Sequence, residues 1–440
     1  MATIGGNRVP RGSAALTLGF GTSVAMWVVC YLSRLPPALV PNWVLATLLL
    51  LCLLAGGAVA GGPGRGGWRL GACAGLVTSL VNLLILGSLL GGARAGGVAP
   101  SALVFIPGSL LLGAALGAAG AAAVGGRASG SVSAVNWTGT FAAIAAVATL
   151  LQLLVGGLVT SEGAGLAVTD WPNSFGYNMF LYPLSRMTGG VFYEHAHRLF
   201  GTLVGLTTVV LAVQLLRAES RGWVKRLGLA AVALVVVQGI LGGLRVTGTF
   251  TLATARDAMS PSTALAAAHG VLGPVFFAVM VALAVVTSST WAGPVEPRPT
   301  PAAETDRALG GLLVGALLVQ LVLGALQRHL TRGLMVHVSF AVVVLVLAVT
   351  YGARVWGLHG DLPLLRRLAR LLSVAAGVQV MLGVLALVAV SSRVEGGPRE
   401  AWQVLLTTAH QGTGAALLGC ATALWLWMYR LLAPEARRAE

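Results

Sequence analysis

The chain has 440 residues, of which 57% are hydrophobic and 9% are charged, whereas about 25% of the residues of an ordinary soluble domain are charged. Its net charge is +15, from 28 Lys and Arg against 13 Asp and Glu. This composition excludes a soluble enzyme, a nucleic-acid-binding module and a disordered chain, and it indicates a polytopic membrane protein.

Twelve apolar runs approach the length of about 20 residues that a helix needs to cross the hydrocarbon core. Because the backbone must satisfy its own hydrogen bonds in lipid, we predict an all-α fold. The predicted helices lie at about 14–33, 44–61, 70–92, 101–125, 138–160, 195–217, 226–244, 263–287, 309–327, 334–354, 370–391 and 402–430.

The basic residues predict the orientation of these helices. With the N-terminus inside, 18 of the 28 Lys and Arg fall on the inner side and 10 on the outer side, as the positive-inside rule requires. Both termini are therefore expected in the cytoplasm. The first run follows Arg8 and Arg11 as a signal peptide does, but no A-x-A-like cleavage site follows it, so we expect a retained anchor.

The chain changes in chemistry near residue 135. Residues 1–135 contain no histidine and no acidic residue, and the first carboxylate is Glu162. We therefore expect residues 1–135 to form a four-helix membrane extension of unassigned role, followed by a first four-helix unit at 136–290 and a second at 291–440. The four cysteines lie in apolar runs without a CxxC pair, so we expect buried, unreactive thiols at Cys30, Cys52, Cys73 and Cys420.

The region after residue 135 repeats itself. One phrase, Gln-x-x-(Leu/Val)-Gly-x-Leu, begins at Gln152, Gln238, Gln320 and Gln379. From Gln238 to Gln379 is 141 residues and from His197 to His337 is 140. From His269 to His410 is again 141, whereas from Gln152 to Gln320 is 168, and the excess of 27 falls in the loop at 161–193. These spacings indicate two tandem four-helix units, the first with an elaborated outer loop.

Each unit carries two histidines near the outer ends of its second and fourth predicted helices: His197, His269, His337 and His410. An ionisable residue inside a membrane span is costly and by default indicates function. Two imidazoles on facing helices suit bis-axial ligation of haem iron, whereas zinc needs three or four converging ligands. The pattern favours one haem site per unit over the alternative of polar core histidines.

The two units differ in acid–base chemistry. Glu194 stands one helical turn before His197 and shares its helix face, whereas Leu334 holds the matching position before His337. This difference predicts one catalytic haem site and one electron-relay or structural haem site. The alternative for Glu194 is an exposed carboxylate favoured by the helix N-terminus.

Several motifs between about 138 and 430 resemble one family. They are Gly157-Leu158-Val159-Thr160, Gly163-Ala164-Gly165, Asp170-Trp171-Pro172, Glu194-x-x-His197-Arg198, Leu241-Gly242-Gly243-Leu244-Arg245-Val246-Thr247, His269-Gly270, His337 and His410-Gln411. Together they resemble the haem A synthase family of the cytochrome oxidase assembly pathway. The resemblance implies an eight-helix core that converts haem O to haem A by stepwise oxidation of a ring methyl to a formyl group.

Residue by residue, the resemblance implies that His197 and His269 bind the substrate haem and that His337 and His410 ligate a haem b. It implies that Glu194 is the acidic residue needed for catalysis. Two features depart from the family. Many bacterial members carry a cysteine pair where Thr169 and Ser174 stand near the Asp-Trp-Pro motif, and the eight-helix core does not need residues 1–135.

Other polar residues near the outer ends have two readings each. Arg198, Arg245, Arg328 and Arg332 are either partners of haem propionates or ordinary helix-end arginines. The Asp170-Trp171-Pro172 motif is either a lid over the substrate site or an interfacial anchor. We expect His195 and His329 at the membrane interface and His359 in a cytoplasmic loop.

We therefore expect a haem A synthase of the bacterial plasma membrane, with its haem sites toward the outer face. Its expected partners are haem O, the lipid bilayer, haem O synthase, an electron donor and a second copy of the chain, but not nucleic acid. A di-haem cytochrome b electron-transfer subunit is the first alternative. A transporter built from repeats is the second.

Overall fold

The structure is a computed structural model of the chain. It describes residues 11–36, 38–62, 65–87, 90, 97–125, 135–248, 260–394 and 397–435. The chain forms two compact units. The first comprises Met1–Ile144, Tyr177–Arg186 and Val213–Ser220, and the second comprises Ala145–Gly176, Met187–Ala212 and Arg221–Glu440. The predicted boundaries at 135 and 290 stay predictions.

Glycine-mediated helix packing organises the first unit. It contains α1 (Arg11–Arg34), α2 (Asn42–Ala60), α3 (Gly67–Leu86) and α4 (Ala102–Val124), with the short helices η2 (Met179–Leu181) and η3 (Leu184–Arg186). A Cβ added to Gly57 would lie 2.2 Å from the carbonyl oxygen of Gly117, and one added to Gly75 would lie 2.0 Å from that of Gly113. Backbones this close need glycine, which is how helices pack tightly in lipid.

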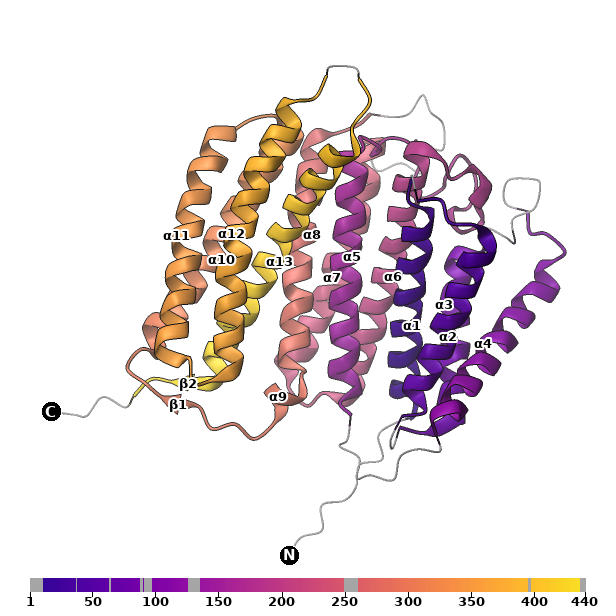
Figure 1. Ribbon diagram of the computed structural model, residues 1–440, viewed down its shortest axis with the longest axis horizontal. Helices are drawn as coiled ribbons and strands as arrows, with labels where there is room; N and C mark the ends of the chain where they lie inside the picture. The colour runs from indigo at the N-terminus through magenta and orange to yellow at the C-terminus, as the bar shows by residue number, and fades with distance from the viewer. Residues whose placement is uncertain are drawn as a thin grey trace, which may run out of the picture. The chain divides into compact units, whose positions relative to one another are not determined.

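The second unit holds most of the repeated region. Its helices are α5 (Trp137–Ser161) and α6 (Gly189–Ala218), each shared in part with the first unit, then α7 (Gly222–Thr247), α8 (Thr263–Val286), α9 (Ser289–Ala292), α10 (Ala303–Leu330), α11 (Leu334–His359), α12 (Pro363–Ser391) and α13 (Ala401–Leu431). Two-residue strands β1 (Arg298–Pro299) and β2 (Leu432–Ala433) pair in parallel. Both α10 and α13 pack against α8, which joins the two halves of the repeat (Figure 1).

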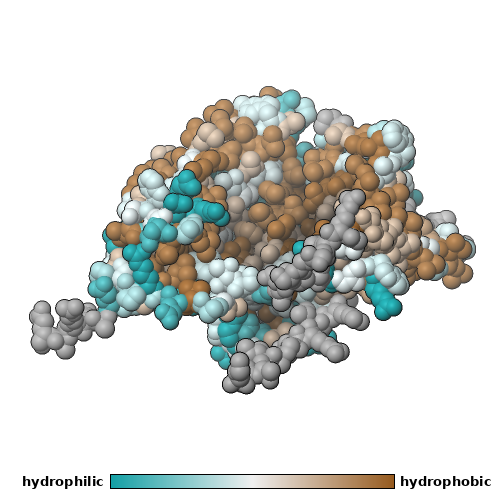
Figure 2. Space-filling view, turned by 60° about the horizontal axis from the view of Figure 1, so that its bottom comes forward, coloured by the Kyte–Doolittle hydropathy of each residue, from teal (hydrophilic) through white to brown (hydrophobic). Residues whose placement is uncertain are grey.

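The predicted all-α membrane fold is confirmed. Among the described residues, eleven helices are long and apolar enough to cross a membrane. Figure 2 shows broad hydrophobic areas between patches of hydrophilic side chains. The predicted span at 402–430 corresponds to α13, the twelfth long helix, which falls outside these eleven. It packs against α8, α10 and α12, so protein rather than lipid surrounds much of it and it can carry buried polar residues such as Thr407 and Thr408.

Two expectations about single residues need correction. His359 ends α11 and is 1% exposed, so it does not lie in a solvated loop. Its Nε2 lies 2.7 Å from Asp306 Oδ2, and Arg354 Nε donates to Asp306 Oδ1 at 2.6 Å. The buried Asp306 carboxylate needs these partners, because burying an unpaired charge is costly. The four cysteines are free thiols as expected, but Cys73 is exposed on α3 and the other three are only partly buried.

Candidate functional site

The four repeated histidines form two pairs. On α6 and α8, His197 and His269 have ring centres 6.3 Å apart and ring planes at 82°. On α11 and α13, His337 and His410 have ring centres 6.4 Å apart and planes at 90°. The duplication seen in the sequence therefore reproduces the same geometry in both halves of the repeat.

This geometry fits a metal held between the two rings. Metal–imidazole bonds are about 2.0–2.1 Å long and the ligating nitrogen lies about 1.1 Å from its ring centre, so two rings on opposite sides of one metal have centres about 6.3 Å apart. Two aromatic rings in direct edge-to-face contact have centres over a wider range, about 4.5–7 Å apart. It is the agreement of both pairs with the narrower value that supports ligation.

Two imidazoles leave the other ligands to the bound group. Within the described ranges, no group of three or more His, Cys, Asp or Glu side chains converges on a point. A porphyrin supplies four equatorial nitrogens of its own, so a pair of axial imidazoles completes its iron. The donor set of both pairs thus fits a haem.

A glycine of the neighbouring helix faces each of the four rings. A Cβ added to Gly156 would lie 2.8 Å from His197 Cε1. The same test at the other three phrases gives 3.0 to 3.1 Å, for Gly242 against His269, Gly324 against His337 and Gly383 against His410. Because real Cβ atoms rarely approach this closely, a side chain at any of these positions would displace the imidazole.

In three of the four phrases the glutamine contacts the same histidine, and in the fourth it lies beside the helix turn that follows the histidine. The amide Nε2 of Gln152, Gln238 and Gln320 donates to the backbone oxygen of His197, His269 and His337, at 3.1, 3.0 and 3.0 Å. The Nε2 of Gln379 would lie 3.0 Å from a Cβ on Gly414, one turn after His410. We call each such Gln–Gly pair the seat of its histidine: Gln152/Gly156, Gln238/Gly242, Gln320/Gly324 and Gln379/Gly383.

The seats also touch the rings. The Nε2 of Gln152 and Gln238 lies 3.4 and 3.5 Å from the ring Nε2 of His197 and His269, and Gln320 Nε2 lies 3.1 Å from Nδ1 of His337. The Nδ1 of His269 lies 3.1 Å from the backbone oxygen of Gln238. In His269 a proton on Nδ1, donated to this carbonyl, leaves Nε2 as the unprotonated nitrogen, the form that binds a metal.

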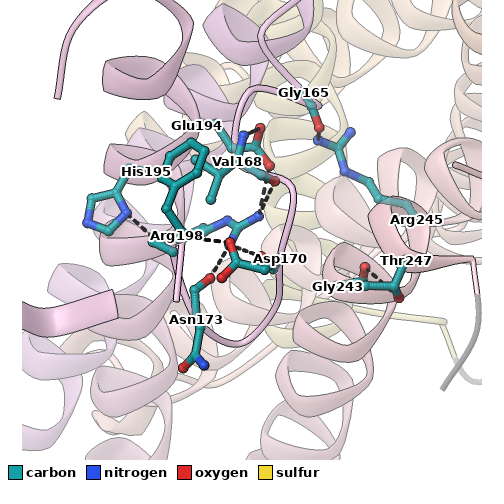
Figure 3. Close-up of polar contacts among 12 residues, drawn as sticks. Gly165, Val168, Asp170, Asn173, Glu194, His195, Arg198, Gly243, Arg245 and Thr247 are labelled. Atoms are coloured by element: carbon teal, nitrogen blue, oxygen red, sulfur yellow. Dashed lines mark hydrogen bonds and ion pairs between the residues drawn. The ribbon is translucent and has the colours of Figure 1, made fainter. Parts of the chain in front are cut away.

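The loop that follows α5 is bound to the first half by charged side chains, as Figure 3 shows. Glu194 is 3% exposed, and its carboxylate accepts from the backbone N–H of Val168 at 3.0 Å and from Arg198 at 3.1 Å. Arg198 also donates to the backbone oxygens of Val168, Asp170 and Asn173. The alternative of an exposed Glu194 is therefore wrong, and the contacts of Arg198 are with the loop.

Further contacts extend this docking to α7. Arg245 donates to the backbone oxygen of Gly165 at 2.7 Å (Figure 3). A Cβ on Gly243 would lie 2.3 Å from Cδ2 of Trp171, so the indole lies against the bare backbone of α7. The adjacent Gly242 faces His269. Gly242 thus leaves room for the ring of His269, and Gly243 leaves room for the indole of Trp171. This arrangement supports the lid interpretation of Asp170-Trp171-Pro172.

Arginines gather near the end of α5 that lies beside the second half of the repeat. Arg328 donates to Ser161 Oγ at 3.0 Å, and Arg399 donates to the backbone oxygens of Thr160 and Ser161. The Nε atoms of Arg328 and Arg393 are buried without a partner among the described residues. Burial and the nearby Arg399 lower the pKa of Arg393 below its ordinary value. The orphaned donors suit an anionic group.

The hydroxyl of Ser161 connects this arginine region to the second histidine pair. Thr407 and Thr408 donate to Ser161 Oγ at 2.9 and 3.0 Å, and they stand just before His410 on α13. Sequence reasoning missed Ser161, Arg393 and Arg399, because their proximity arises only from the packing of α5 against α13. None of these three residues belongs to the repeated phrase or to the repeated histidines.

The other polar residues predicted near the site, His195, His329 and Arg332, lie in three different environments. His195 is 1% exposed, and its Nδ1 lies 3.0 Å from Ser174 Oγ, within the docked loop. The Nε2 of His329 lies 3.2 Å from the position of a Cβ on Gly270, beside His269, so a residue of the second half borders the first pair. Arg332 lies exposed between α10 and α11.

Comparisons with known proteins agree with the motifs. The family model COX15-CtaA, described as cytochrome oxidase assembly protein, matches residues 175–338. A protein named Protoheme IX farnesyltransferase from Haloarcula marismortui is 33% identical over 167 residues, which cover 38% of this chain and 33% of that protein. The chain thus spans about a third of the length of this curated relative. The resemblance to the haem A synthase family is confirmed by the match of residues 175–338 to the cytochrome oxidase assembly protein family.

Proposed function

We propose that this protein is a haem A synthase, which oxidises a ring methyl of haem O to the formyl group of haem A. The observation that carries the proposal is the pair of equivalent bis-imidazole sites, at 6.3 and 6.4 Å, in the two halves of one repeat. The family match supports a role in cytochrome oxidase assembly. The name of the haloarchaeal relative, Protoheme IX farnesyltransferase, also refers to a haem.

In this proposal His197 and His269 bind the substrate haem O. The docked loop and its tryptophan exclude water from the outer side of this site, which strengthens electrostatic interactions within it. Glu194 is a buried carboxylate one turn from His197 and accepts or orients a proton during oxidation of the methyl carbon. Arg198 and Arg245 hold the loop, and the propionate role expected for Arg198 competes with its three contacts to the loop and its ion pair with Glu194.

His337 and His410 hold a resident haem b in the second half. When bound, this group supplies one-electron transfer to and from the first site. Arg328, Arg393 and Arg399 provide cationic donors for its carboxylates, since guanidinium–carboxylate pairs are strong. The protein lies in the bacterial plasma membrane with both termini cytoplasmic and both sites near the outer face. Haem O synthase, an electron donor and a second copy of the chain are its proposed partners.

The matching geometry of the two pairs also favours a second candidate, a di-haem cytochrome b subunit that transfers electrons without porphyrin chemistry. An absorption spectrum and haem extraction of the purified protein separate the two. Haem b together with haem O or haem A supports the synthase. Two equivalents of haem b alone support the electron-transfer subunit, and a protein without a Soret band contradicts both.

A further inference from the structure

The repeated glutamine phrase has a chemical role beyond marking the duplication. We propose that the glutamine and glycine of each seat are positioning residues, which set the orientation and the metal-binding strength of the axial imidazole on the next helix. This inference rests on the proposed function, because it concerns residues that act on the haem through its ligands.

The strongest support is that one arrangement occurs four times. Each phrase spaces Gln and Gly by four residues, so both side-chain positions lie on one helix face. In every case the glycine faces the edge of the ring, with an added Cβ 2.8 to 3.1 Å from Cε1. A helix with only structural glycines has no reason to place one opposite the same imidazole atom in four separate helix pairs.

The carboxamide acts on the histidine backbone. A helical carbonyl is already an acceptor within its own helix, so the Gln Nε2 bonds of 3.0 to 3.1 Å to three histidine carbonyls are additional. Glycine follows three of the four histidines by one turn, at Gly201, Gly273 and Gly414, and the glutamine amide would lie 3.0 to 3.3 Å from a Cβ there. The absent side chains admit the amide, which joins the ligand helix to its neighbour.

The oxygen atom of each seat carboxamide also supports a positioning role for the glutamine. The Oε1 of Gln152, Gln238, Gln320 and Gln379 is buried without a hydrogen-bond partner among the described residues. Leaving a buried acceptor unpaired costs about 1–3 kcal/mol. Three of the four amides also lie against the ring of their histidine, and partners beyond the ligands determine ligand basicity.

The test uses glycine-to-alanine pairs on the same helix. In Gly324→Ala the new Cβ meets His337, whereas in Gly315→Ala, also on α10, nothing lies within 4 Å. Gly383→Ala and Gly377→Ala form the same pair on α12, and Gly242→Ala and Gly239→Ala form it on α7. Each control gains helix propensity, because alanine is the better helix former.

The readouts are the reduction equilibrium and the low-spin electron paramagnetic resonance signal of the second haem in the purified protein. We expect Gly324→Ala and Gly383→Ala to change the one-electron reduction equilibrium constant at least threefold and to shift the low-spin signal, with both controls unchanged. Loss of the haem spectrum from a seat variant that still elutes as folded protein has the same meaning. Unchanged potentials and signals in both seat variants overturn the proposal.

A second pair of variants protects the test against misfolding. Gln320→Leu removes the amide donor to His337, while Gln327→Leu removes another α10 glutamine whose Oε1 is also buried without a partner among the described residues. Equal potentials for the two variants contradict the seat role. A wild-type protein that contains haem with insensitive seats contradicts only this inference, whereas a wild type without haem overturns the proposed function and the seats together.

Discussion

The two histidine pairs share their ligand geometry and differ in what surrounds it. The spacing of 140 residues that relates His197 to His337 relates Glu194 to Leu334 and Arg198 to Val338. The spacing of 141 relates Gly243 to Val384 and Arg245 to Ala386. Each side chain that docks the loop, and the glycine that admits its tryptophan, therefore has an apolar counterpart in the second half.

This comparison separates binding from chemistry. The features that recur in both halves are the imidazole pair and its seats, which in the proposed function hold a haem in each half. The features present only in the first half cover the site, place a buried carboxylate beside it and keep two arginines there. In the proposed synthase, the first half would bind the haem that is oxidised and the second half would bind the haem that is retained.

The largest effect is expected from removing one ligand of either pair. His410→Ala leaves His337 without its partner and should remove the second haem while the first pair still binds haem O. His269→Ala should do the reverse. Haem extraction from each purified variant measures this, and haem A formation should fall to background in both. If both variants lose the same haem species, the two pairs do not have separate occupants.

The next largest effect concerns Glu194. Glu194→Ala should lower the rate of haem A formation by about 10²–10⁴, the usual contribution of general acid–base catalysis, with the spectrum of the second haem unchanged. Activity is measured as haem A formed per protein by extraction and chromatography.

Glu194→Gln distinguishes proton transfer from loop docking. It keeps an acceptor for the Val168 N–H but loses the ion pair and the titratable group. If Glu194→Gln forms haem A at the wild-type rate, Glu194 serves to dock the loop and not to move a proton.

A smaller effect is expected from replacing Gly243 of the first half with valine, the residue at the matching position 384 of the second half. Gly243→Val places a Cβ against Trp171 and should release the loop. Overpacking costs about 1–3 kcal/mol, so we expect roughly tenfold slower haem A formation and faster proteolysis within 162–176. The matched control is Val384→Gly, because Val384 holds the matching position of the second half and is 59% exposed. Equal activities of the two variants would contradict the lid.

Composition and repetition predicted the coarse fold and the pairing of the histidines, because both leave long-range signals in a sequence. Hydropathy predicted all twelve long helices, α13 included, but not that α13 carries a buried polar face and packs against α8, α10 and α12. His359 was misplaced because its partner, Asp306, lies 53 residues away. The seats were visible as the repeated Gln-x-x-x-Gly spacing, but only the structure shows that each glycine faces an imidazole.

The smallest effect concerns the arginines at the second site. Arg328→Gln removes a cationic donor whose Nε has no partner among the described residues, while Arg332 is exposed and serves as the control in Arg332→Gln. A hydrogen bond to a charged group contributes about 1.5–3 kcal/mol, but Arg393 and Arg399 remain nearby and compensate in part. We therefore expect Arg328→Gln to release the second haem only several-fold faster during transfer to apomyoglobin. Equal release from both variants would mean that the haem carboxylates lie elsewhere, and that the cationic region at Ser161 joins α5 to α13 without contacting the cofactor.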